Sequence, residues 1–244
     1  AALLTVADKH GLPLIEDAAC AVGSEIRWNG SWQRIGRPHG VIACFSFHPR
    51  KVMTTGDGGM LTTSSADYDA QLRLLRQHGM SVSDRVRHGA HEVIFEEHTE
   101  IGFNYRMTDI QAAVGREQLR RLPEIITARR RIAAAYSSRL SEVSGVRGPI
   151  EPDGMRSNWQ SYTVELQTGC DQRNVMQQLL LRGVASRRGV MCAHREIPYR
   201  TMQRHSLAES ERAQDRFIIL PLYPQMTDDD VDYVVSTLVA AISD

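Results

Sequence analysis

A lysine, Lys51, lies where a predicted strand runs into a glycine-rich turn, and this placement could support covalent chemistry. The strand is expected over residues 41–47, where apolar and β-branched residues dominate, so both its faces should be covered, as in a parallel sheet. A lysine amine that loses its proton attacks carbonyl carbons and can afterwards carry protons. Most lysines are solvated surface charges, so the neighbouring residues decide between the two interpretations.

An acidic residue holds a similar position earlier in the chain. Residues 12–15 predict a short strand, and Asp17 follows at its carboxyl end. Proteins with open parallel sheets place their ligands at this edge, so a carboxylate there is available to a ligand. The alternative is that Asp17 merely caps the next helix. Lys51 at the end of the next buried strand favours the functional interpretation.

Further polar residues surround Lys51. Ser46 precedes it by five residues, and His48 lies between them. For His48, a satisfied core histidine is favoured over a direct catalytic role. The GDGG sequence at 56–59 predicts tight backbone geometry, but it does not match a nucleotide-binding fingerprint.

Composition limits the classes of protein to consider. The 244 residues are 42% hydrophobic and 24% charged, which is typical of a soluble globular protein with one large domain or two modest ones. The 29 basic and 29 acidic side chains balance, so neither a nucleic-acid binder nor a membrane-surface binder is favoured. No apolar run reaches membrane-spanning length.

The cysteines and histidines do not predict a metal site. The four cysteines are scattered without a CxxC pair, so neither a zinc site nor a disulfide framework is expected, and a reducing cytoplasm is the favoured location. His88, His91 and His98 lie in a polar segment, 81–100, without a helical i, i+4 pair. We therefore expect no metal.

The elements that must position these residues follow from periodicity and breakers. The 142–158 segment is rich in glycine and proline and predicts a linker between domains at 1–141 and 142–244. Pro123 is expected to interrupt a helical pattern that Thr108 and Gln111 begin with a capping box. Helices are expected over 1–10, 67–79, 108–122, 125–140, 171–182 and from 227 onward, and strands over 12–15, 41–47, 60–63, 160–166, 184–190 and 217–220.

Four stretches resemble motifs of one family. These are LPLIEDAAC, FSFHPRKVMTTGDGG, GFNYRMTDIQAA and SRRGVMCAHREIPY. They are similar to motifs of the DegT/DnrJ-type nucleotide-sugar aminotransferases, which use pyridoxal 5′-phosphate (PLP). The resemblance implies an α/β fold like that of aspartate aminotransferase: the later half of a large PLP-binding domain, a long bridging helix, and a small C-terminal α/β domain. Because the chain opens inside such a pattern and without Met, we expect that the family's N-terminal part is missing.

The resemblance also implies roles for particular residues. Lys51 would form the Schiff base, Asp17 would keep the pyridine nitrogen protonated, and Ser46 would bind the cofactor phosphate. Asn104 would reach the phosphate of a neighbouring subunit in a homodimer. Cys20 stands near the ring, where many family members have glutamine. Substrate contacts are expected from the loop that contains Arg188 and His194.

The function that the resemblance implies is transfer of an amino group from an amino acid, expected to be glutamate, to a keto-sugar attached to a nucleotide. One alternative is sugar dehydration on the same scaffold. Relatives with that chemistry replace the lysine with histidine, which Lys51 speaks against, although His48 is close by. The other is a non-catalytic regulator that retains the fold.

Overall fold

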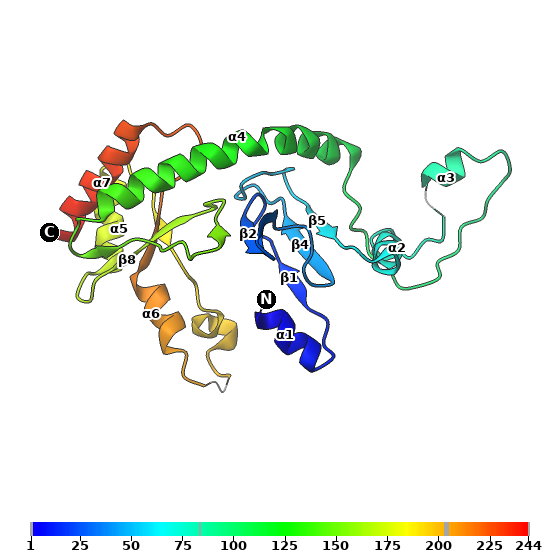
Figure 1. Ribbon diagram of the computed structural model, residues 1–244, viewed down its shortest axis with the longest axis horizontal. Helices are drawn as coiled ribbons and strands as arrows, with labels where there is room; N and C mark the ends of the chain where they lie inside the picture. The colour runs from blue at the N-terminus through cyan, green and yellow to red at the C-terminus, as the bar shows by residue number, and fades with distance from the viewer. Residues whose placement is uncertain (1, 83, 203–204, 244) are drawn as a thin grey trace. The chain divides into compact units, whose positions relative to one another are not determined.

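The computed structural model describes residues 2–82, 84–202 and 205–243. The chain forms two compact units, Ala1–Leu122 and Pro123–Asp244. Figure 1 follows the elements of each unit along the chain. The unit boundary lies inside one long helix, and the predicted division into domains at 141/142 stays a prediction. None of the helices in the described ranges is both long enough and apolar enough to cross a membrane.

A three-stranded sheet carries the chemistry-bearing residues of the first unit. Strand β1 (Ile15–Asp17) pairs in parallel with β4 (Ile42–Ser46), and β5 (Gly59–Thr62) adds to β4 in the antiparallel sense. The expectation of a β4 covered on both faces was wrong. Only Ala43 within it is buried, and the other four residues of β4 are partly exposed in the described structure.

The segment between β1 and β4 is a hairpin. Strands β2 (Glu25–Trp28) and β3 (Ser31–Arg34) pair around Asn29 and Gly30, whose φ angles are 47° and 82°. Two successive positive φ angles characterise the turn that suits the twist of two-residue hairpins, and Asn-Gly is its preferred sequence.

The helices of the first unit largely follow the predicted pattern. Helix α1 spans Ala2–Lys9, and α2 spans Ala66–Leu75, where the Ser65 side chain accepts a hydrogen bond from the Tyr68 amide (3.3 Å). The segment predicted as a polar loop contains a short helix, α3 (Asp84–His88).

Helix α4 (Asp109–Leu140) runs through Pro123 without a break, so the predicted interruption was wrong. Its capping box is present: the Thr108 amide donates to Gln111 Oε1 (3.0 Å), and the Gln111 amide donates to Thr108 Oγ1 (3.3 Å). A proline inside a helix costs about 3 kcal/mol. Leu122, Ile125 and Ile126 are buried on either side of Pro123, and burial of this kind offsets that cost.

The second unit is built on an antiparallel sheet with the order β6-β8-β10-β9. The predicted strand at 184–190 shrinks to the two residues of β9. The strands are β6 (Val146–Arg147), β8 (Tyr162–Leu166), β9 (Arg187–Arg188) and β10 (Phe217–Leu220), and β7 (Met155–Arg156) precedes β8. The helices are α5 (Gln172–Leu181), α6 (Ala208–Arg216) and α7 (Asp228–Ser243), with 3-10 turns η1 (Ala193–Arg195) and η2 (Ile197–Tyr199).

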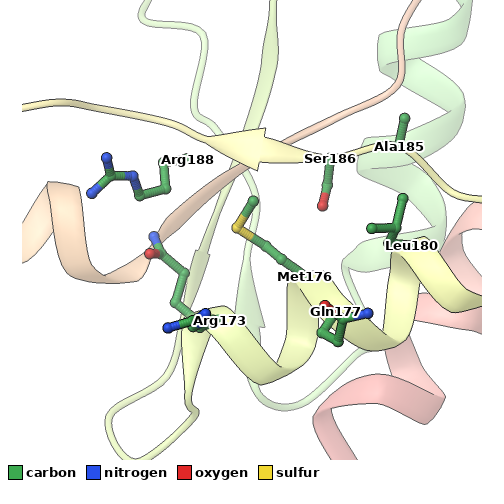
Figure 2. A pocket seen from close by; sticks show the side chains of 8 residues that line it. Arg173, Met176, Gln177, Leu180, Ala185, Ser186 and Arg188 are labelled. Atoms are coloured by element: carbon green, nitrogen blue, oxygen red, sulfur yellow. The ribbon is translucent and has the colours of Figure 1, made fainter.

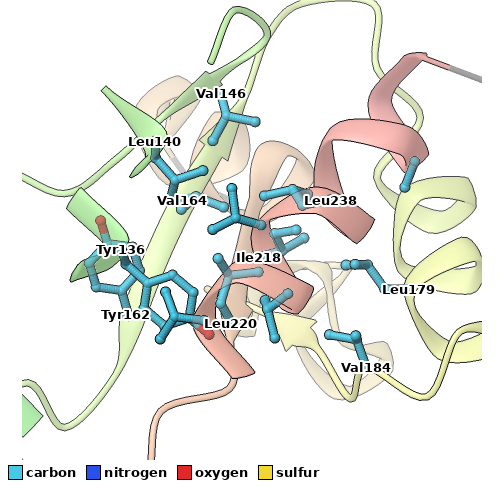
Figure 3. Close-up of a cluster of buried hydrophobic side chains, with 14 of the residues drawn as sticks. Tyr136, Leu140, Val146, Tyr162, Val164, Leu179, Val184, Ile218, Leu220 and Leu238 are labelled. Carbon is cyan, nitrogen blue, oxygen red and sulfur yellow. The ribbon is translucent and has the colours of Figure 1, made fainter. Parts of the chain in front are cut away.

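One hydrophobic core holds this unit together. Side chains of α5 and α7 meet those of the sheet, as Figure 3 shows for Leu179, Leu238 and Ile218. The Tyr136 and Tyr162 rings stack with their centroids 4.9 Å apart, and the Tyr136 hydroxyl donates to the Pro221 carbonyl (2.8 Å). Burial raises the pKa of Tyr136, because the phenolate would lose its hydration.

We expect that replacing Thr227 by alanine destabilises the second unit by about 1 kcal/mol. Thr227 precedes α7, and its hydroxyl oxygen accepts from the Asp230 amide (3.2 Å), while its own amide donates to Asp230 Oδ2 (2.8 Å). Urea unfolding measures the loss. Ser236→Ala, in the middle of the same helix, is the control, and an equal loss there would contradict a capping effect.

Candidate active site

The sheet of the first unit places Asp17 and Ser46 at one edge. Asp17 is the last residue of β1 and lies opposite Cys44 of the parallel β4, and Ser46 lies two residues further along β4. Because side chains alternate along a strand, Asp17, Cys44 and Ser46 share one face. Burial raises the pKa of the Cys44 thiol, and the negative charge of Asp17 raises it further. These three side chains therefore lie at the carboxyl ends of two parallel strands, which is where proteins with open parallel sheets bind their ligands.

Lys51 lies in the turn that follows β4. Its amide donates to the His48 carbonyl (2.9 Å), and the Arg50 amide donates to His48 Nδ1 (3.2 Å). Val52 and Met53 directly after it are buried. The buried pair anchors the turn, while Lys51 itself remains half-exposed. His48 is exposed, and its ring nitrogen accepts a hydrogen bond within the turn. The interpretation as a core histidine was therefore wrong.

The glycine-rich turn closes behind Lys51 through side-chain contacts to the backbone. Thr54 Oγ1 donates to the Phe47 carbonyl (2.8 Å), and Thr55 Oγ1 donates to the Asp57 carbonyl (2.6 Å). Gly58 has a φ of 144°, and an added Cβ there would lie 2.8 Å from Thr55 Oγ1. Gln111, from the first turn of α4, donates to the same Asp57 carbonyl (3.0 Å). The motifs around Lys51 and Thr108 are thus joined in space.

Cys20 contacts the lysine directly. The Lys51 amine donates a hydrogen bond to Cys20 Sγ at 2.9 Å. The backbone after β1 continues the ladder with a bond from the Ala18 amide to the Cys44 carbonyl (2.9 Å) and then turns, which brings Cys20 back toward β4. Four of the predicted site residues (Asp17, Cys20, Ser46 and Lys51) therefore gather at one end of one sheet.

Asn104 lies in another part of the same unit. It forms an isolated bridge with Gln77, and the flanking amide of Tyr105 donates to the Arg76 carbonyl (3.0 Å). Its side chain is exposed. The backbone of this segment is held against the end of α2, so the side chain is presented outward from a fixed strand-like stretch.

Arg188 and His194 belong to the second unit. Arg188 lines an open pocket of about 530 Å³ between α5 and β9, and Arg173 and Met176 of α5 line the same pocket (Figure 2). His194 is not among the residues that line this pocket, and its Nε2 lies 2.9 Å from Glu211 Oε1. The structure therefore does not bring the two predicted substrate residues into one pocket.

Sequence reasoning overlooked Glu16, which braces the sheet. Its Oε1 accepts hydrogen bonds from the amides of His39 (2.5 Å) and Gly40 (2.8 Å), just before β4 begins. The His39 ring packs on Trp28 with centroids 4.4 Å apart. An added Cβ at Gly40 would lie 2.1 Å from the Leu14 carbonyl oxygen, so this position requires glycine. The sequence did contain a signal for this role. Glu16 directly precedes Asp17, so its side chain points to the opposite face of β1.

We expect that Glu16→Ala lowers the free energy of unfolding by about 2–3 kcal/mol, because two backbone amides lose a charged acceptor. Glu16→Gln is the matched control, since its amide oxygen can still accept those hydrogen bonds, and it should cost less. Denaturant unfolding of both variants measures the difference. Equal stability of the alanine variant and the unaltered protein would show that Glu16 does not brace the start of β4.

The donor groups at the sheet edge suit one kind of cofactor. A primary amine, a carboxylate and a hydroxyl lie at one end of one sheet: Asp17 ends β1, Ser46 ends β4, and Lys51 follows in the turn after β4. PLP needs an amine for its aldehyde, an anion for its ring nitrogen and donors for its phosphate, so these residues fit it. In the described ranges, no three His, Cys, Asp or Glu side chains are arranged to hold a metal ion.

The model of the DegT/DnrJ/EryC1/StrS aminotransferase family matches residues 1–239, and the chain belongs to this family. The resemblance predicted from the motifs is confirmed, as is the fold class.

Relatives and solved structures agree with this assignment. GDP-perosamine synthase of Caulobacter vibrioides is 35% identical over 240 residues, which cover 97% of this chain and 60% of that protein. The spore coat polysaccharide biosynthesis protein SpsC of Bacillus subtilis is 32% identical over 246 residues, covering 97% of this chain and 61% of that protein. The chain therefore spans about three fifths of the length of these relatives.

Two crystal structures show the same fold. The aminotransferase TlmJ of Streptoalloteichus hindustanus superimposes with a TM-score of 0.84 at 32% identity, covering 99% of this chain and 62% of that one. The structure of DesI, solved in the presence of its TDP-sugar product, superimposes with a TM-score of 0.83 at 31% identity. The match covers 99% of this chain and 58% of the DesI chain.

Proposed function

We propose that this chain carries the lysine and the carboxylate of a PLP-dependent aminotransferase that acts on nucleotide sugars. An amino acid, expected to be glutamate, would donate the amino group, and a keto-sugar linked to a nucleotide would accept it. The observation that carries the proposal is the Lys51 amine, which contacts Cys20 beside the strand ends that hold Asp17 and Ser46. The names of the relatives, a GDP-perosamine synthase and an enzyme solved with a TDP-sugar product, support the substrate class.

Each residue has a defined task in this proposal. PLP, when bound, supplies an aldehyde for covalent attachment and a ring that accepts electrons. Lys51 provides the attaching amine and later moves a proton at the substrate carbon. Asp17 would hold the positive ring nitrogen, and Ser46 would donate its hydroxyl to the phosphate. Asp17 is already oriented, because its Oδ1 accepts from the Ala19 amide (3.1 Å).

We also propose a homodimer in which Asn104 serves the site of the neighbouring subunit. The segment around Asn104 exposes Ile101, Phe103 and Tyr105, the first of them to 91%. Contiguous exposed apolar side chains of this kind mark interaction surfaces. A cytoplasmic location is part of the same proposal, supported by four cysteines that form no disulfide. Arg188 and His194 stay proposed substrate contacts, and their separation in the second unit leaves Arg188 as the better-placed residue for an anion.

Labelling of the amines tests the assignment of the lysine. The chain contains two lysines, Lys9 and Lys51, so borohydride reduction with added PLP can mark either one, and peptide mapping separates them. We expect the label on Lys51 in the unaltered protein and in a Lys9→Arg variant. A label confined to Lys9 would refute the proposal.

The products of the reaction separate the alternatives. Incubation with a nucleotide-linked keto-sugar and glutamate should give an amino-sugar nucleotide and a keto acid. Loss of water from the sugar, with PLP attached at Lys51, would instead support the dehydratase. A folded chain that takes up no PLP would support the non-catalytic regulator.

A further inference from the structure

The contact between Cys20 and Lys51 joins a nucleophilic sulfur to the amine on which the proposed function rests. The two heavy atoms lie 2.9 Å apart, which is shorter than ordinary van der Waals contact between nitrogen and sulfur. Cys20 sits in the turn after β1 and Lys51 in the turn after β4, so two different segments of the sheet edge hold the atoms together. The amine is therefore held within reach of the sulfur.

The Cys20 thiol is also open to small oxidants. Cys20 is exposed, whereas Cys44 and Cys170 are half-buried and Cys192 is buried. The Cys192 thiol donates to the Ser210 carbonyl (3.2 Å), which ties it to the protein interior. Accessibility governs which cysteines are oxidised. Among the described cysteines, the exposed one is thus the one with an amine beside its sulfur.

We propose that Cys20 and Lys51 form an oxidative modification site in which peroxide links the sulfur to the amine. Hydrogen peroxide first oxidises the thiol to a sulfenic acid, and the peroxide is reduced to water. The lysine nitrogen then attacks the sulfur, an S–N bond forms, and the sulfenic oxygen leaves as a second water. The product is a sulfenamide, the kind of condensation that sulfenic acids undergo with nearby nitrogen.

This inference rests on the proposed function in one respect: it predicts how oxidation of Cys20 affects the attachment of PLP to Lys51. A Lys51 nitrogen bound to sulfur no longer has the two hydrogens that attachment to an aldehyde requires. PLP and peroxide therefore compete for one amine, and attached cofactor protects it. An external dithiol reverses the modification in two steps. Its first thiol attacks the Cys20 sulfur, forms a mixed disulfide and releases the Lys51 amine. Its second thiol then reduces this disulfide and restores the Cys20 thiol.

Mass spectrometry of the tryptic peptides is the direct test. Cys20 is the only cysteine of residues 10–27, and Lys51 lies at the start of residues 51–73, so a link between these peptides identifies both atoms. After treatment with limited hydrogen peroxide, we expect the joined pair at the summed mass less two hydrogen atoms. Dithiothreitol should separate it again.

Three variants or treatments provide controls. Cys20→Ser should give no joined pair, and peroxide should leave its PLP uptake at its own untreated level. Cys170→Ser should behave like the unaltered protein. Protein loaded with PLP and reduced with borohydride should also give no joined pair.

Two results would overturn the modification site. A sulfinic acid at Cys20 without any joined peptide would show that the lysine does not trap the sulfenic acid. A joined pair that retains an oxygen atom would show that the proposed condensation does not occur. Failure of the reduced protein to take up PLP would instead count against the proposed function, and the peptide map decides the modification separately.

Discussion

Replacement of Lys51 by alanine is expected to abolish covalent attachment of PLP and to remove nearly all amino transfer. The side chain supplies the attaching amine and the proton carrier, and a positioned proton carrier alone contributes about 10²–10⁴-fold to a rate. The loss should appear in the single-turnover transfer of the amino group from glutamate. It should also appear as the absence of borohydride-fixed label in the peptide that begins at residue 51.

Two controls sharpen this prediction. Lys9→Arg removes the other lysine and should leave both measurements unchanged, because Lys9 ends α1, ahead of β1 in the chain, whereas Lys51 follows the carboxyl end of β4. Added methylamine should restore part of the proton transfer to the alanine variant, since a free amine can replace the missing one. Undiminished transfer by the alanine variant would remove Lys51 from the mechanism.

Asp17→Asn is expected to slow amino transfer by about 10²–10³-fold, the range found when one preorganised electrostatic contact to a developing charge is lost. The amide keeps the shape of the carboxylate and can still accept from the Ala19 amide, so the turn after β1 should persist. PLP should still attach at Lys51. The change therefore falls on the rate rather than on covalent attachment.

A substitution at the neighbouring residue is the control for Asp17→Asn. Glu16→Gln removes the same charge one residue earlier, on the opposite face of β1, where the carboxylate binds backbone amides. It should lower stability and leave the rate per folded molecule nearly unchanged. Equal losses of rate in the two variants would mean that Asp17 acts through general electrostatics of the strand rather than on the cofactor.

The sequence was most informative about the residues at strand ends. The placement of Asp17, Ser46 and Lys51 at one sheet edge could be predicted because each lies at or just beyond the end of an apolar run, and strand ends of a parallel pair meet at one edge. Their roles came from the family resemblance and stay predictions. Contacts between segments could not be found in this way. The Lys51–Cys20 bond and the clamp of Gln111 on the Asp57 carbonyl depend on the three-dimensional path of two turns.

Local rules failed where tertiary contacts outweigh them. Pro123 normally ends a helix, yet α4 continues because buried residues flank the proline. Of the strand expected at 184–190, only two residues pair with β10. Val184 is not among them, although it is buried and valine favours strands. Propensity describes what a segment tolerates, whereas packing decides its extent.

The adjacent carboxylates of β1 have a consequence for how this family's variation is interpreted. Glu16 and Asp17 differ by one methylene group, but one supports the backbone of the next strand and the other faces the candidate site. In a saturation mutagenesis screen, both positions would reject most substitutions. Protein abundance would fall for changes at Glu16, whereas selection for product would reveal changes at Asp17. Scoring glutamate and aspartate as interchangeable would therefore merge two unrelated constraints into one.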